Sequence, residues 1–135
     1  KGAWIMHTLR SAINDDNTWF TILKEFMVEN AQSHVDTEDF FAKVKEKTGN
    51  DYSYFSEQYF YTPNQPELEY YQTDSEFYYK WSNVNENFVM PIDFLINGLE
   101  KRVFPSQEFQ SFNISKHATI EVMDWKFYVK PKKKN

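Results

Sequence analysis

Three histidines are the residues of this sequence best suited to binding a catalytic metal. His7, His34 and His117 lie far apart, and none has a second histidine within one helical turn. The His-Glu-x-x-His pattern, which places two imidazoles and a general base on one helix face, does not occur. We interpret His7 as an ordinary helical histidine and the other two as exposed loop residues, and predict no metal-binding residue in this chain.

Three pairs of carboxylates could in principle perform acid–base catalysis: Asp15 with Asp16, Glu38 with Asp39, and Glu67 with Glu69. The first two pairs stand where helices are expected to begin, and the helix dipole favours negative charge there. The third pair has the spacing of side chains that point outward from one strand. We therefore assign all three pairs to structural roles.

Other catalytic patterns have no support in the sequence. There is no cysteine, which excludes thiol nucleophiles and cysteine metal sites, and no Gly-x-Ser-x-Gly turn for a nucleophilic serine. With 3 glycines, no phosphate-binding loop is evident either. The sequence predicts neither catalytic nor cofactor-binding residues, so this chain alone is not expected to be an enzyme.

A group of aromatic residues offers an alternative of another class, a carbohydrate- or protein-binding module. Rings exposed on a strand can stack against sugars, and this group has six of them: Tyr70, Tyr71, Phe77, Tyr78, Tyr79 and Trp81. Because neighbouring residues of a strand point to opposite faces, half of the rings must point inward. We favour packing against the helices or against a further domain over a sugar-binding surface.

Charge and hydropathy exclude two kinds of partner. The net charge of −5 argues against nucleic-acid binding, which depends on a clustered basic face. The single basic cluster, Lys130 and Lys132–Lys134, is interpreted as a solvated tail. No apolar run reaches the roughly 18 residues that a membrane-spanning helix requires.

Hydrophobic periodicity divides the chain into a helical half and a strand half. The helical spacing predicts four helices, over 1–14, 15–33, 37–49 and 51–61, with Thr37 as an N-cap and Gly49 as a stop. Their buried faces are expected to contain Ile5, Met6, Leu9, Ala12, Ile13, Trp19, Ile22, Leu23, Phe26, Met27, Phe40, Phe41, Val44, Phe55, Tyr59 and Phe60.

Alternation replaces the helical spacing after Pro66. Phe77, Tyr79 and Trp81 share one side, as do alternate residues from Phe88 to Ile96, and Asn97-Gly98 has the composition of a two-residue hairpin turn. Further strands are predicted over 68–72, 99–104, 109–114, 119–123 and 126–130. The sequence therefore predicts an α+β fold, with a helical domain over 1–66 and a small antiparallel β-sandwich over 67–135.

The first residues also lead us to expect a piece of a longer protein. The apolar spacing of the first helix begins at once, with no Ser, Thr, Asp or Asn before Lys1 to cap its free N–H groups.

Four stretches of the helical half resemble the zinc aminopeptidases of the aminopeptidase N and leukotriene hydrolase family, in order and in spacing. Lys1-Gly2-Ala3 and the helix to Arg10 are similar to the segment after that family's catalytic tyrosine. The other three stretches are Asp15–Phe20, Val35–Phe40, and Thr48–Asp51 followed by Tyr54–Tyr59. After Pro66 only the strand pattern and Asp124-Trp125 are similar.

The resemblance implies a parent enzyme that removes N-terminal residues of peptides with a zinc-activated water. Its metal ligands, general base and substrate-binding segment have no counterpart in this chain, and its tyrosine would stand two residues before Lys1. We therefore expect a non-catalytic fragment, whose partner is the remainder of the parent peptidase. Zinc and peptide substrate would bind only to the parent.

Overall fold

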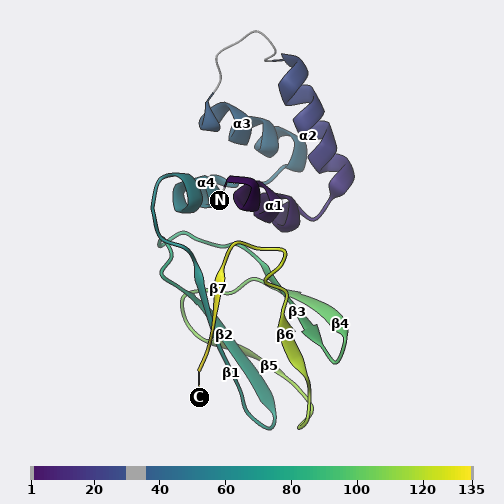
Figure 1. Ribbon diagram of the computed structural model, residues 1–135, viewed down its shortest axis with the longest axis vertical. Coiled ribbons are helices and arrows are strands. Elements are labelled where there is room, and N and C mark those ends of the chain that lie inside the picture. Colours follow the sequence, from purple (N-terminus) through teal and green to yellow (C-terminus); the bar gives the residue numbers. More distant parts are fainter. Residues whose placement is uncertain (1, 30–35, 135) are drawn as a thin grey trace.

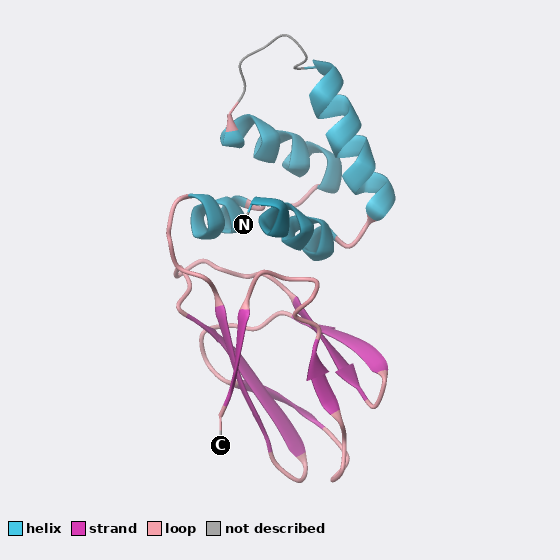
Figure 2. Cartoon of the chain, viewed as in Figure 1, coloured by secondary structure: helices cyan, strands magenta, loops and turns pink. Residues whose placement is uncertain are grey.

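The computed structural model describes residues 2–29 and 36–134, and it places four helices at one end and two β-sheets at the other (Figures 1 and 2). The helices are α1 Gly2–Ile13, α2 Asp16–Glu29, α3 Thr37–Thr48 and α4 Ser53–Phe60. The strands are β1 Glu67–Gln72, β2 Glu76–Ser82, β3 Ile92–Ile96, β4 Leu99–Val103, β5 Gln110–Asn113, β6 Ile120–Val122 and β7 Lys130–Lys133. The predicted α+β class, with helices first and strands second, is confirmed.

Helix α3 has the most complete capping of the described helices, and its N-cap differs from the prediction. Asp36, rather than Thr37, is the N-cap: its carboxylate accepts a bond from the N–H of Asp39, whose carboxylate accepts one from the N–H of Asp36. The reciprocal capping box joins an N-cap residue to the residue three positions later, and the residue three positions before Asp39 is Asp36 rather than Thr37. Gly49 ends the helix as predicted, at φ 76°, where a side chain would be strained.

Two residues predicted to be buried in the helices are exposed. Met27 is 70% exposed and Phe60 is 42% exposed. Helix α2 lies at the outer end of the helical part (Figure 1), so only one of its sides has neighbours, and it fully buries only Trp19 and Ile22. Phe60 is the last residue of α4, and its ring still contacts that of Phe41 at a centroid distance of 6.0 Å.

The strands form two sheets that pack face to face. One has the order β5-β2-β1-β7 and the other β4-β3-β6. Phe77 and Tyr79 of β2 meet Phe94 of β3 at centroid distances of 4.9 and 6.1 Å, which places aromatic rings at the centre of the sandwich. The predicted hairpin is confirmed: Asn97 and Gly98 have φ of 51° and 83°, and Ile96 pairs with Leu99.

The C-terminal lysines are exposed, as predicted, but they form a strand rather than a tail. Strand β7 runs parallel to β1, in place of the strand predicted over 126–130. Lys132 pairs with Glu67 at 2.8 Å and Lys134 with Glu69 at 3.0 Å. Opposite charges on adjacent strands thus hold a segment whose composition alone resembles a tail. The sandwich therefore contains one parallel pair among antiparallel ones.

A second correction concerns the residues before β3. Phe88 and Met90 are buried as expected, but residues 83–91 form an irregular connection and the strand begins only at Ile92. The indole N–H of Trp81 donates to the carbonyl of Met90 at 2.9 Å, which holds this connection against β2 without a strand ladder. Phe88 and Met90 are buried on either side of an exposed residue, as in a strand, although the segment itself is irregular.

Buried residues of both halves belong to one hydrophobic cluster, which runs from Ile5 in α1 to Val129 before β7. The division into domains over 1–66 and 67–135 stays a prediction, although helices do give way to strands between Phe60 and Glu67. The predicted end of the second helix at 31–33 and the predicted loop at His34 lie outside the described residues. None of the described helices has the length and apolarity needed to cross a bilayer.

Candidate functional site

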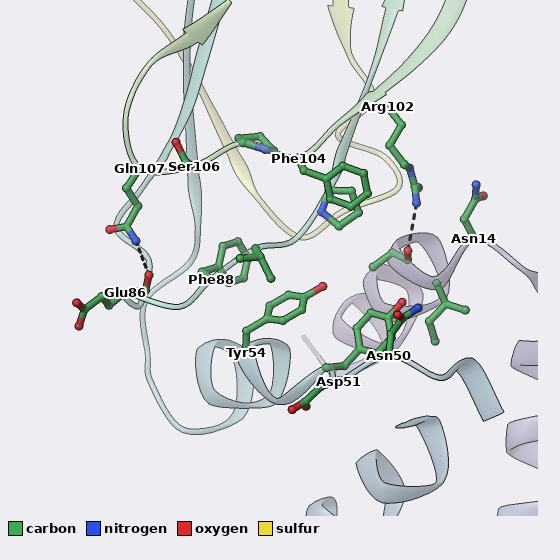
Figure 3. A pocket seen from close by; sticks show the side chains of 16 residues that line it. Asn14, Asn50, Asp51, Tyr54, Glu86, Phe88, Arg102, Phe104, Ser106 and Gln107 are labelled. Carbon is green, nitrogen blue, oxygen red and sulfur yellow. Dashed lines mark hydrogen bonds between the residues drawn. The ribbon is translucent and has the colours of Figure 1, made fainter. Parts of the chain in front are cut away.

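A cleft of about 760 Å³ opens where the helices meet the sheets (Figure 3). Its walls come from the end of α1, the connection between α3 and α4, the connection before β3, and the segment after β4. Apolar residues dominate several of these walls, and a few polar side chains stand among them. Such a mixture is typical of sites that bind small molecules or peptide segments.

Tyr54 forms part of the cleft floor. It lies in the first turn of α4 and is 7% exposed, with its ring packed between those of Tyr52 and Phe88 at centroid distances of 5.9 and 5.7 Å. Its hydroxyl points into the cleft beneath Phe104 (Figure 3) and has no hydrogen-bond partner among the residues that the structure describes. Burial raises the pKa of the Tyr54 phenol well above its ordinary value of 10, so the hydroxyl keeps its proton.

Arg102 and Asp93 connect the cleft to the second sheet. Asp93 is 5% exposed and accepts two bonds from Arg102, from Nε at 2.7 Å and from Nη2 at 3.1 Å. Lys126 adds a third bond at 3.2 Å. A buried carboxylate needs such partners, because an unpaired charge in this position would be strongly unfavourable.

Arg102 also binds the C-terminal end of helix α1. Its Nη1 donates to the carbonyl of Ala12 at 3.1 Å and its Nη2 to that of Ser11 at 2.7 Å. The last carbonyls of a helix lack intrahelical donors and carry partial negative charge, so a guanidinium is well suited to satisfy them. One side chain of β4 therefore fixes the end of a helix about ninety residues earlier in the chain.

Two further bonds orient the opposite side of the cleft. The buried Gln58 of α4 accepts a bond from the N–H of Asn85 at 2.7 Å, and its own amide donates to the carbonyl of Asn64. Gln107 donates to the carbonyl of Glu86 at 3.0 Å, as drawn in Figure 3. These bonds hold the connection before β3 between the helices and the segment after β4.

The histidines do not converge. Nε2 of His7 lies 3.2 Å from the carbonyl of Trp125, to which it can donate, and His117 is exposed in a loop. His34 lies outside the described residues. Across residues 2–29 and 36–134, no three His, Cys, Asp or Glu side chains gather in a way that could hold a metal ion, so the residues present do not fit a zinc centre.

The carboxylate pairs have the structural surroundings that we expected. Asp15 accepts two bonds from Thr18, from its N–H at 3.1 Å and its hydroxyl at 2.9 Å, and these lower its pKa. Asp39 belongs to the capping box of α3. Glu67 and Glu69 bind the lysines of β7.

The aromatic group divides between the two faces of its sheet. Phe77, Tyr79 and Trp81 are buried, as expected for the rings of one strand face, so none of these three is open to stack against a ligand. Tyr71 and Tyr78 stack on the outer face at 4.5 Å, and Phe109 meets Tyr71 edge-on at 5.2 Å.

The residues that shape the cleft were missed by the sequence analysis, although one signal was present. A two-residue turn at Asn97-Gly98 sets the register that places Asp93 opposite Arg102. An Asp inside an apolar strand is unfavourable unless a positively charged side chain pairs with it. Nothing local identifies the unpaired hydroxyl of Tyr54. It follows from the contact between α4 and the connection before β3.

Comparison with known proteins finds this arrangement of helices and sheets within a much larger molecule. No family model and no curated protein matches the chain. A solved structure matches 98% of this chain with a TM-score of 0.72, at 18% sequence identity. That structure is of an aminopeptidase A from Legionella pneumophila, in complex with aspartic acid. The chain spans only 17% of the length of that protein, so at this identity the two share a fold over a small part of the larger molecule.

Proposed function

We propose that this chain is a non-catalytic part of a larger zinc-dependent aminopeptidase of the aminopeptidase N and leukotriene hydrolase type. The observation that carries the proposal is the match of nearly the whole chain to one sixth of a molecule named an aminopeptidase. The ordered resemblance of four stretches in residues 1–59 supports it independently. Residues 1–66 would end the catalytic domain, and residues 67–135 would form the sandwich that follows.

In such an enzyme the part described here would position helix α1. The resemblance puts the catalytic tyrosine just before this helix, and two residues of the β-sheet half hold the helix in place. The N–H of Tyr128 donates to the hydroxyl of Thr8 at 2.7 Å, and Arg102 binds the carbonyls of Ser11 and Ala12. A helix held along its length keeps the residues that precede it in a defined orientation, which catalysis by a hydroxyl requires.

The test compares two proteins from the same gene locus, the 135-residue chain and the product of the complete open reading frame. The complete product is expected to hydrolyse aminoacyl p-nitroanilides, to lose activity with a chelator and to regain it with zinc. The chain alone is expected to show neither hydrolysis nor stoichiometric zinc. Hydrolysis by the chain alone, or a complete product without a His-Glu-x-x-His helix, would refute the proposal.

The outer face of the first sheet supports a second candidate, binding of a carbohydrate or a protein. Tyr71, Tyr78 and Phe109 form an aromatic surface there, and the ammonium of Lys80 lies 4.9 Å from the centre of the Phe109 ring. Glycan-array binding that Phe109→Ala abolishes, with Phe20→Ala on helix α2 as the control, would favour this candidate. An array without signal would remove the carbohydrate as a ligand of this face.

A further inference from the structure

The Tyr54 hydroxyl is the polar end of a largely buried side chain. The ring packs against Tyr52 and Phe88, and the hydroxyl stays open to the cleft, where it can donate a hydrogen bond to a ligand in place of water. No partner for it is found in the described part of the chain, and the group faces the cleft (Figure 3). A hydrogen-bond acceptor supplied by a ligand would satisfy it.

The apolar walls determine the body of such a ligand. Phe104 and Val89 line the cleft and are 64% and 55% exposed, so their side chains are open to contact. Pro91 and Pro105 lie beside them, and Phe88 closes the floor next to Tyr54. Surfaces of this kind favour an aromatic or branched aliphatic group.

The charges of the cleft exclude an anion as the preferred ligand. Arg102 is the single cation among the described lining residues, and its charge is already paired with Asp93. Four of its five N–H groups are used, two for Asp93 and one each for the carbonyls of Ala12 and Ser11. Asp51 and Glu86 line the same cleft and would repel a carboxylate or phosphate.

Carboxamide side chains also line the cleft. Asn14 and Asn50 both line the cleft near the end of α1 (Figure 3). A carboxamide both donates and accepts, as a peptide group does, so these residues suit a ligand that contains an amide rather than an isolated ketone or ether.

From these observations we propose that the cleft between the helices and the sheets is a binding site for a neutral, peptide-like ligand. An aromatic or branched side chain would lie against Phe104 and Val89, and an amide carbonyl would accept a hydrogen bond from Tyr54. This inference goes beyond the proposed function and does not depend on it, since it concerns a site that the chain itself contains.

The experiment titrates the ¹⁵N-labelled 135-residue chain with N-acetyl-L-phenylalaninamide and follows amide resonances. We expect saturable shifts confined to the cleft, at residues such as Val89 and Phe104. Two related probes separate the effect of a negative charge from the effect of a hydrogen-bond acceptor. N-acetyl-L-phenylalanine, which has a carboxylate in place of the second amide, and toluene, which has no acceptor, are both expected to bind more weakly.

Three variants test the assigned contacts. Tyr54→Phe removes only the hydroxyl and is expected to raise the Kd of the amide about 3- to 10-fold, the usual effect of losing one hydrogen bond. Phe104→Ala, at an exposed position where folding is not at risk, should also weaken binding. Tyr61→Phe, at an exposed tyrosine that does not line the cleft, should leave the Kd unchanged.

Other outcomes would overturn the proposal. These are the absence of saturable shifts up to the solubility limit of the amide, shifts centred on another surface, or a Kd that Tyr54→Phe leaves unchanged. Equal or tighter binding of the carboxylate probe would contradict the exclusion of anions.

Discussion

The carboxylate of Asp93 and the guanidinium of Arg102 form a two-bond ion pair in the sheet, at 2.7 and 3.1 Å, while the same guanidinium binds the end of helix α1. Register explains how they meet: they are direct partners on adjacent strands joined by the Asn97-Gly98 turn. The pair therefore links the two halves of the molecule through a single side chain.

Arg102→Met should destabilise the protein strongly. It leaves the buried Asp93 with only Lys126 as a charged partner and leaves the carbonyls of Ser11 and Ala12 without a donor, so the loss expected is about 3–5 kcal/mol. Urea unfolding followed by circular dichroism measures the change. Arg10→Met is the matched control, because Arg10 pairs with an exposed Asp16 and its loss should destabilise the protein far less.

The double variant Asp93→Leu with Arg102→Met should recover part of that loss. Removing both charges leaves no unpaired ion in the sheet, and apolar replacements of buried pairs are often nearly neutral. If the double variant were as unstable as the sum of the single variants, the destabilisation would not come from an unpaired charge.

The ion pair between Glu69 and Lys134 predicts a dependence of stability on pH. The neighbouring Ser82 hydroxyl and Lys134 ammonium lower the pKa of Glu69 below its ordinary value of 4.5. Because the folded-state pKa is the lower one, the contribution of Glu69 is present above about pH 4.5 and is lost as the pH falls through the folded-state pKa. Glu69→Gln should therefore lower the Tm at neutral pH, and the difference from wild type should shrink in acid. A constant difference across this range would contradict the assignment.

Thr8 provides a test of the connection between α1 and the C-terminal segment. Its hydroxyl is fully buried and accepts the N–H of Tyr128 at 2.7 Å. Thr8→Val keeps the shape but leaves that N–H without an acceptor, which should cost about 1–3 kcal/mol. Thr21→Val on helix α2, where the hydroxyl is exposed, should change the free energy of unfolding by less than about 0.5 kcal/mol. Equal effects at the two sites would show that the Tyr128 bond contributes nothing specific.

Gly98 should be intolerant of a side chain for conformational reasons alone. Nothing lies within 4 Å of the position of an added Cβ, but φ is 83°. Gly98→Ala should cost about 1–2 kcal/mol, the usual penalty of a left-handed conformation. Gly2→Ala, which is equally unobstructed and helical, should not destabilise the protein. Thermal unfolding of both variants distinguishes backbone strain from steric conflict, because a loss at both positions would contradict the conformational explanation.

Local sequence signals determined most of the elements. Apolar spacing set the four helices, Gly49 ended α3, and Asn97-Gly98 fixed the β3–β4 hairpin, because caps and tight turns depend on the conformational preferences of a few adjacent residues. The same turn determined that Asp93 would face Arg102, since the register of a hairpin follows from its turn.

Tertiary structure decided what depends on distant partners. Lys130–Lys133 became a strand because β1 offers it a free edge and two carboxylates. Phe88 and Met90 are buried without forming a strand because bonds from Trp81 and to Gln58 hold the connection in place. The cleft and the Tyr54 hydroxyl that opens into it likewise exist only where helices and sheets meet. A local sequence pattern reflects only which conformation a segment prefers. Burial, strand pairing and charge compensation depend on which distant segments the folded chain brings into contact.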